Sequence, residues 1–124
     1  MCRFDEIRVW SRTPDHAKRF AELHGAIAMD LEPAVRGADV IVTATNSLEP
    51  FLKGEWLKEG AHVNAIGSPR PTWRELNDAM HNTLVVDSRE AVLKESGDAQ
   101  RIGNHGVQVR RRCRRGHRCG AACL

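Results

Sequence analysis

Residues 40–45 limit the possible folds more than any other part of the chain. They read Val-Ile-Val-Thr-Ala-Thr, an unbroken and mostly β-branched run. Runs of this kind are typical of parallel strands that are buried on both faces of a sheet. The segment therefore predicts a central strand of a doubly wound α/β sheet, the fourth in the usual numbering of such folds.

Strand and helix patterns alternate on both sides of this run. The segment at 48–59 predicts a loop with one helical turn, in which Phe51, Leu52 and Trp56 pack back on the protein. Such alternation is what βαβ units require, so the expected fold class is α/β, with a Rossmann-type parallel sheet. Strands are expected at 6–10, 26–29, 60–67 and 83–87, and helices at 14–23, 31–35, 73–80 and 88–95.

The glycine-rich G-x-G-x-x-G turn of dinucleotide-binding folds does not occur in this sequence. No strand is predicted before residue 6 either. In the strand order 3-2-1-4-5-6, the first strand lies between the second and the fourth. Without it, the sheet would lose ladder hydrogen bonds worth about 0.5 to 1.5 kcal/mol each, so we expect a partial and marginally stable Rossmann domain over residues 4–98.

The segment at 6–13 points to a cofactor. Its β-branched stretch ends in Ser11, Arg12 and Thr13, at the place where a dinucleotide-binding fold contacts the adenosine ribose. An Asp or Glu there would accept a hydrogen bond from the 2′-hydroxyl of NAD, whereas two hydroxyls and a guanidinium suit a 2′-phosphate. The sequence therefore predicts NADPH. In the alternative, this is only a polar turn, with Thr13 capping a helix that begins at Pro14.

The charge is distributed unevenly along the chain. Seven arginines and no acidic residues fall in residues 101–124, although the whole chain has 19 basic and 16 acidic residues. We expect 99–124 to be a basic, disordered tail, as an out-of-frame or alternatively spliced reading would produce. An arginine-rich arm that binds nucleic acid is the alternative. No aromatic residue is interleaved for base stacking, which disfavours nucleic acid as a partner.

The cysteines of the tail do not form a recognised metal motif. Cys113, His117, Cys119 and Cys123 have enough ligand atoms for zinc, but their spacing differs from paired CxxC knuckles. We therefore expect free thiols and no metal site. The sequence has neither a run of eighteen apolar residues nor the apolar core of a signal peptide, so a cytoplasmic location is expected.

A series of motifs lies in order at 6–13, 37–45, 54–56, 62–67, 70–71, 73–76 and 93–98. Together they resemble the ornithine cyclodeaminase family, and most closely its mu-crystallin branch of NADPH-dependent ketimine reductases. The resemblance covers about residues 4–98. It implies reduction of the C=N bond of cyclic imine carboxylates, binding of thyroid hormone, and a homodimer.

The resemblance also implies site residues. Ser11 stands where the family has an asparagine, beside Arg12 and Thr13, in the triplet that holds the 2′-phosphate. Glu95 matches a position near the bound hormone, although a solvated carboxylate at the end of a helix is an equally good reading. The other implied cofactor contacts are His16 near the adenosine and Thr45, Asn46 and Ile66 along the rest of the cofactor.

No catalytic residue can be carried over to this chain. Pro69 stands where family members have an acid-base aspartate or a serine, and a proline side chain cannot transfer a proton. The groups that bind the substrate carboxylate would lie in a family region outside the resemblance. We therefore expect the isolated chain to be catalytically incomplete. The alternative is a non-enzymatic fragment that binds NADPH or thyroid hormone, alone or paired with a full-length subunit.

Overall fold

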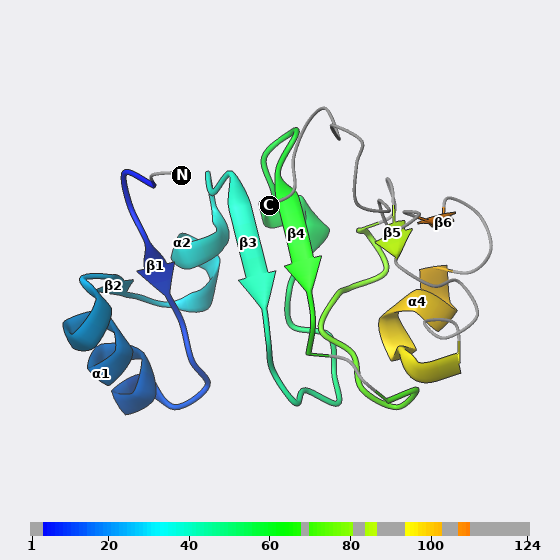
Figure 1. Ribbon diagram of the computed structural model, residues 1–124, viewed down its shortest axis with the longest axis horizontal. Helices are drawn as coiled ribbons and strands as arrows, with labels where there is room; N and C mark the ends of the chain where they lie inside the picture. The colour runs from blue at the N-terminus through cyan, green and yellow to red at the C-terminus, as the bar shows by residue number, and fades with distance from the viewer. Residues whose placement is uncertain (1–3, 68–69, 81–83, 87–93, 103–106, 110–124) are drawn as a thin grey trace, which may run out of the picture. The chain divides into compact units, whose positions relative to one another are not determined.

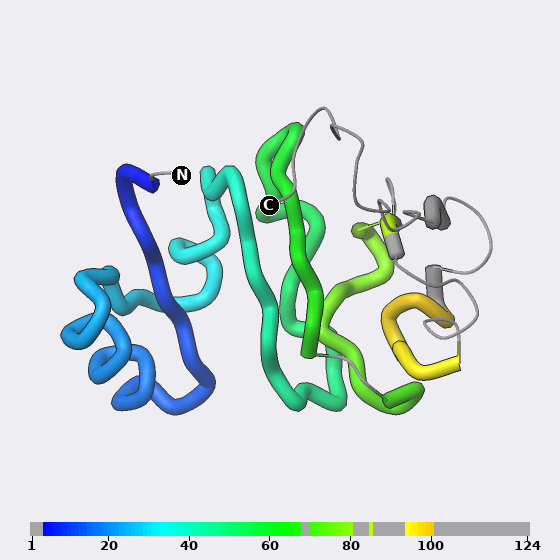
Figure 2. Tube along the Cα trace, viewed as in Figure 1, coloured from blue at the N-terminus to red at the C-terminus, as the bar shows by residue number. Residues whose placement is uncertain are grey.

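The structure is a computed structural model that describes residues 4–67, 70–80, 84–86, 94–102 and 107–109. It divides into two compact units: unit 1 is Met1–Val42 with Glu55–Asn64, and unit 2 is Thr43–Gly54 with Ala65–Leu124. Figure 1 labels the α-helices and strands, and Figure 2 traces the chain through them. In order they are β1 (Arg8–Val9), α1 (Pro14–His24), β2 (Ile27–Ala28), α2 (Leu31–Val35), β3 (Val40–Thr43), the 3-10 helix η1 (Gly54–Trp56), β4 (His62–Ala65), β5 (Leu84–Val86), α4 (Gly97–Ile102) and β6 (Val107–Val109).

The described strands are short and form three parallel pairs, β1 with β2, β3 with β4, and β5 with β6. In the second pair, the N–H of His62 donates to the carbonyl of Asp39 and the N–H of Ile66 to that of Thr43, both at 2.9 Å. The two strands point the same way in Figure 1. The predicted α/β class with parallel strands is thus confirmed. A single doubly wound sheet is not seen, because the described strands do not join beyond these pairs.

Helix α1 follows from local signals in the sequence. Pro14 occupies its first turn, where a missing N–H costs nothing, and Asp15 lies in the same turn near the positive end of the helix dipole. Gly25 ends the helix in the left-handed region at φ 66°, with its N–H on the carbonyl of Ala21. One expectation fails here: Thr13 is the N-cap residue, but its side chain makes no capping hydrogen bond.

Replacing Gly25 with alanine should lower the free energy of unfolding by about 1 kcal/mol. The cost is conformational, because a Cβ added at Gly25 would meet no heavy atom within 4 Å while its φ of +66° stays unfavourable for an L side chain. Urea denaturation followed by circular dichroism measures this loss. Gly25→Asn is the matched variant and should cost less, since asparagine tolerates the left-handed region. Equal losses for both variants would contradict this explanation.

Strand β3 corrects the expectation for residues 40–45. The strand ends at Thr43, and its side chains alternate between buried and exposed rather than being buried on both faces. Ile41 and Thr43 are buried, whereas Val42 is 60% exposed. Valine, isoleucine and threonine favour any extended strand, so their uninterrupted run did not show which faces are covered.

Residues 73–80 were expected to form a helix, and this expectation is wrong. The segment is extended, with Leu76 in a parallel β-bridge to Leu52, and then turns. The carbonyl of Glu75 accepts from the N–H groups of Phe51 and Leu52 at 3.1 and 2.9 Å, and the N–H of Asn77 donates to the carbonyl of Leu52 at 3.0 Å. These partners in another segment replace the hydrogen bonds that a helix would make within itself.

The expectations for the loop at 48–59 and the strand at 83–87 are confirmed, and the helix expected at 88–95 is described only in part. The loop before β4 contains η1, and Leu52 within that loop is fully buried, as predicted. Strand β5 lies within the predicted 83–87, while only the helical residues 94–95 of the predicted helix at 88–95 are described.

Secondary structure continues past residue 98. Helix α4 runs to Ile102, and β6 pairs with β5 in the register Leu84↔Val107, Val85↔Gln108 and Val86↔Val109. The expectation of disorder from residue 99 is therefore wrong for 99–102 and 107–109. Residues 103–106 and 110–124, including the four candidate zinc ligands, lie outside the described residues.

Two kinds of feature are absent from the described residues. No helix there is both long enough and apolar enough to cross a membrane. In the same part of the chain, no three His, Cys, Asp or Glu side chains gather where they could share a metal ion.

Candidate cofactor-binding site

The first group of predicted site residues forms the turn between β1 and α1 in unit 1. Ser11 is half-buried, and its Oγ accepts a hydrogen bond from the N–H of Thr13 at 3.3 Å. This bond closes a local turn of the kind that serine side chains commonly make. Thr13 and His16 are exposed, and the backbone N–H of His16 donates to the carbonyl of Thr13 at 3.0 Å.

Arg12 lies at the centre of this turn with an exposed side chain. Within the described part of the chain, its guanidinium takes part in no hydrogen bond or ion pair. A guanidinium offers donors in a fixed planar geometry that matches phosphate oxygens, and the neighbouring hydroxyls can add further donors. The start of α1 is also favourable for an anion. This donor set fits the 2′-phosphate of NADPH.

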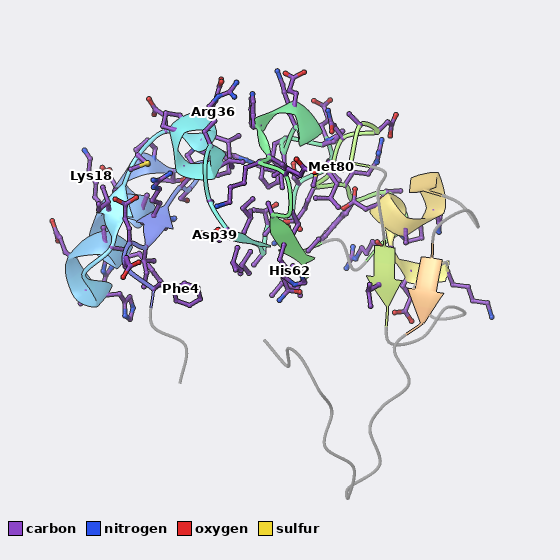
Figure 3. The ribbon with its side chains drawn as sticks, turned by 90° about the horizontal axis from the view of Figure 1, so that it is seen from above. Phe4, Lys18, Arg36, Asp39, His62 and Met80 are labelled. Atoms are coloured by element: carbon purple, nitrogen blue, oxygen red, sulfur yellow. The ribbon has the colours of Figure 1, made fainter. Side chains whose placement is uncertain are left out.

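The second group lies at the carboxyl end of the β3–β4 pair, in unit 2. Thr45 is half-buried and Asn46 is exposed just beyond β3, and Ile66 follows β4 with 62% of its surface exposed. The opposite end of the pair, where Asp39 and His62 lie side by side, is seen in Figure 3. Because ligands of open α/β sheets bind outside the carboxyl ends of the strands, the second group lies at the expected edge.

A buried glutamate that the sequence did not single out holds this edge. Glu75 is 0% exposed, and its carboxylate accepts three hydrogen bonds from residues that the structure describes. Oε2 accepts from the hydroxyl of Thr43 at 2.6 Å and from the N–H of Gly67 at 3.0 Å. Oε1 accepts from the N–H of Thr45 at 2.5 Å. A buried carboxylate needs such donors, because loss of water is costly for a charged group.

Asp98, which is 5% exposed, fixes the backbone that carries Glu75. Its carboxylate accepts from the N–H of Glu75 at 2.9 Å and from the N–H of Leu76 at 3.1 Å. The Nε of Arg74 lies 3.7 Å from the same carboxylate, and the other end of this guanidinium binds Asp78 at 2.6 Å. The sequence predicted neither carboxylate as a structural group, because their hydrogen-bond partners lie 8 to 32 residues away along the chain.

Gly67 allows the close approach on which this cluster depends. A Cβ at this position would collide with the Glu75 carboxylate and with the backbone N and O of Thr45. A glycine at the end of a strand commonly lets the backbone approach a ligand. In the structure, the groups that approach it are the protein's own carboxylate and a neighbouring strand end.

Two further predicted positions, Glu95 and Pro69, belong to neither group. Glu95 is exposed in a short helical stretch of unit 2. Pro69, which stands where family members have an acid-base aspartate or a serine, lies outside the described residues. The structure thus groups Ser11, Arg12, Thr13 and His16 in unit 1, and places Thr45, Asn46 and Ile66 at one strand edge in unit 2.

Comparisons with known proteins show what this chain is similar to. The chain is 52% identical over 100 residues to ketimine reductase mu-crystallin from Mus musculus, a match covering 77% of this chain and 32% of that protein. It is 40% identical over 106 residues to a Delta(1)-pyrroline-2-carboxylate reductase from Bacillus cereus, with the same coverage of 77% and 32%. The chain thus spans about a third of the length of the curated relatives it matches.

Solved structures show the same relationship. Delta(1)-pyrroline-2-carboxylate reductase from Thermococcus litoralis, solved with NADH and L-proline, matches with a TM-score of 0.66 and 35% identity over 73% of this chain and 31% of that one. A probable ornithine cyclodeaminase from Bordetella pertussis matches with a TM-score of 0.66 and 31% identity over 82% and 37%. The sequence model of the ornithine cyclodeaminase/mu-crystallin family matches residues 1–111, and the chain belongs to that family.

Proposed function

We propose that this chain forms part of the nicotinamide-cofactor domain of a reductase that acts on cyclic imines. The observation that carries the proposal is the placement of the cofactor residues inferred from the sequence at the carboxyl ends of β1, β3 and β4, in a chain whose family includes such reductases. We keep residues 4–98 as the extent of this partial Rossmann domain. A first strand with its glycine loop would complete the domain.

We further propose that the cofactor is NADPH rather than NADH. Support comes from Arg12, which is exposed, has no described partner, and lies between the hydroxyls of Ser11 and Thr13. An acidic residue, which would select the ribose 2′-hydroxyl of NAD, is absent from this turn. His16, on the first turn of α1, would contribute near the adenosine. Thr45, Asn46 and Ile66 would line the remainder of the cofactor.

Replacing Arg12 with alanine should weaken NADPH binding by roughly 10- to 100-fold, the equivalent of about 1.5 to 3 kcal/mol for hydrogen bonds to a charged group. The dissociation constant for NADH should change less than about threefold, because NADH lacks the phosphate. Titration calorimetry with both cofactors measures the difference. Arg19→Ala is the matched control, because Arg19 is also an exposed arginine but lies on α1, and it should change the affinity for neither cofactor. An equal loss for both cofactors after Arg12→Ala would remove the support for NADPH.

The substrate class that follows is a cyclic imine carboxylate, to whose C=N carbon NADPH supplies hydride when bound. We assign no catalytic residue to this chain, and we propose that it is catalytically incomplete alone. Binding of thyroid hormone near Glu95 and pairing with a second or a full-length subunit belong to the same proposal. Their support is the family relationship, together with the exposure of Glu95.

A thermal melt of the 124-residue chain with and without millimolar NADPH tests the proposed function. Ligand that binds only the folded state raises the transition temperature, so a cooperative transition that rises with NADPH is the expected result. Imine reduction is then assayed on the same sample, and no turnover is expected. A transition that NADPH leaves unchanged would contradict cofactor binding, whereas turnover would contradict catalytic incompleteness.

A further inference from the structure

The strongest unexplained feature of the molecule is the buried carboxylate of Glu75, for which the proposed function gives no role. Its partners are not scattered. Thr43 and Thr45 lie at and beyond the end of β3, and Gly67 lies beyond the end of β4. A single side chain therefore connects the carboxyl ends of two neighbouring parallel strands.

The position of this carboxylate relative to the strand ladder is informative. The bond from the N–H of Ile66 to the carbonyl of Thr43, at 2.9 Å, lies at the end of the pair. Beyond it, Glu75 accepts the N–H groups of Thr45 and Gly67, one from each strand's continuation. The carboxylate thus holds the two strand extensions together beyond the point where the pairing of β3 and β4 stops.

The same segment also holds the loop on the far side of Asn46. The N–H of Arg74 donates to the carbonyl of Ser47 at 3.0 Å, while Glu75 binds the N–H of Thr45. The Oγ of Thr45 accepts from the N–H of Ser47 at 3.3 Å, which tightens the turn. The backbone on both sides of Asn46 is therefore fixed, and the Asn46 side chain is left exposed.

We propose that Glu75 is a positioning residue for the dinucleotide: its buried carboxylate fixes the carboxyl ends of β3 and β4, and so presents Thr45, Asn46 and Ile66 to the cofactor. This inference rests on the proposed function, because those three residues are its expected contacts. Precise placement matters at such an edge, since a site that is rigid beforehand loses less entropy when it binds. Glu75 acts through the backbone it holds.

The test compares two ligands on the 124-residue chain and its Glu75→Gln variant. NADPH includes the parts expected to contact residues 45, 46 and 66, whereas adenosine 2′,5′-bisphosphate carries only the end expected at Arg12. Glutamine has the shape of glutamate, but its NH₂ group must face at least one of the backbone donors. We expect NADPH affinity to fall roughly tenfold or more, as leaving a buried donor without a partner predicts, and affinity for the bisphosphate to stay within about twofold.

Each result decides a different claim. A selective loss of NADPH affinity supports the positioning role. Unchanged affinity, or equal loss of both ligands, overturns that role while the proposed function stands. If the unmodified chain does not bind NADPH, the proposed function fails and the positioning role fails with it. A role in stability alone would not separate the two ligands.

A second variant decides the question if Glu75→Gln does not fold, as judged by near-ultraviolet circular dichroism. Thr43→Val removes one of the three donors with little change of shape, and Thr43→Ser keeps the hydroxyl as its control. We expect Thr43→Val to weaken NADPH binding by roughly three- to tenfold, and Thr43→Ser to bind as the unmodified chain does. Equal NADPH affinity for both variants overturns the proposal.

Discussion

Replacing Asp98 with alanine is expected to lower the free energy of unfolding by about 3 to 5 kcal/mol. The carboxylate accepts the N–H groups of both Glu75 and Leu76, in a place where Asp98 is 5% exposed. Alanine would leave both amides buried without an acceptor and would remove the charge that faces Arg74. Since small domains are stable by only about 5 to 15 kcal/mol, the variant would be near the limit of folding. Urea denaturation measures the change.

A graded series makes this prediction specific. Oδ1 of Asp98 lies 3.2 Å from the N of Glu75 and 3.1 Å from the N of Leu76, so the single side-chain oxygen left by Asp98→Asn can still accept from both amides. That variant should lose about half as much stability. Asp78→Ala is the control, because it also removes a partner of Arg74, but one whose carboxylate is 65% exposed, and an ion pair with an exposed partner is worth about 1 kcal/mol or less. If Asp98→Ala costs no more than Asp78→Ala, the backbone of Glu75 does not depend on Asp98.

The same contacts explain what the sequence could predict about the fold. Helix α1 was predictable because its signals are local, with Pro14 and Asp15 at its start and Gly25 at its end. Helix α2 also matches the expected 31–35. The segment at 73–80 has apolar residues at helical spacing, but its amides and carbonyls bind residues distant in sequence. The spacing of apolar residues in one segment does not show which distant residues it will bind. Here the hydrogen bonds to distant residues outweigh the local preference for a helix.

The candidate site also has a part that could be predicted from the sequence and a part that could not. The turn from Ser11 to Thr13 is contiguous in sequence, so its donor groups could be read directly. The carboxylate of Glu75 meets Thr43, Thr45 and Gly67 across separations of 32, 30 and 8 residues. Nothing in the Trp-Arg-Glu-Leu motif distinguishes a buried glutamate from one on a solvated helix face. Only the folded chain shows that Glu75 belongs to the strand edge.

The cluster also depends on a position with no side chain at all. We expect Gly67→Ala to lower the free energy of unfolding by about 2 to 4 kcal/mol, near the upper end of the cost of overpacking. The added methyl group would overlap both the Glu75 carboxylate and the backbone of Thr45. Because backbone atoms cannot rotate away as a flexible side chain can, the strand ends must separate or the carboxylate must leave its donors.

The control for this substitution is Gly60→Ala. Gly60 has a φ of +78° and open space around an added Cβ, so alanine there costs only backbone strain, about 1 kcal/mol. Urea denaturation of both variants separates crowding from strain, since crowding is present only at Gly67. If Gly67→Ala costs no more than Gly60→Ala, then the ends of β3 and β4 can move apart cheaply, and Glu75 does not hold them at a fixed distance. A larger cost at Gly67 would show that the edge proposed to bind the cofactor resists displacement.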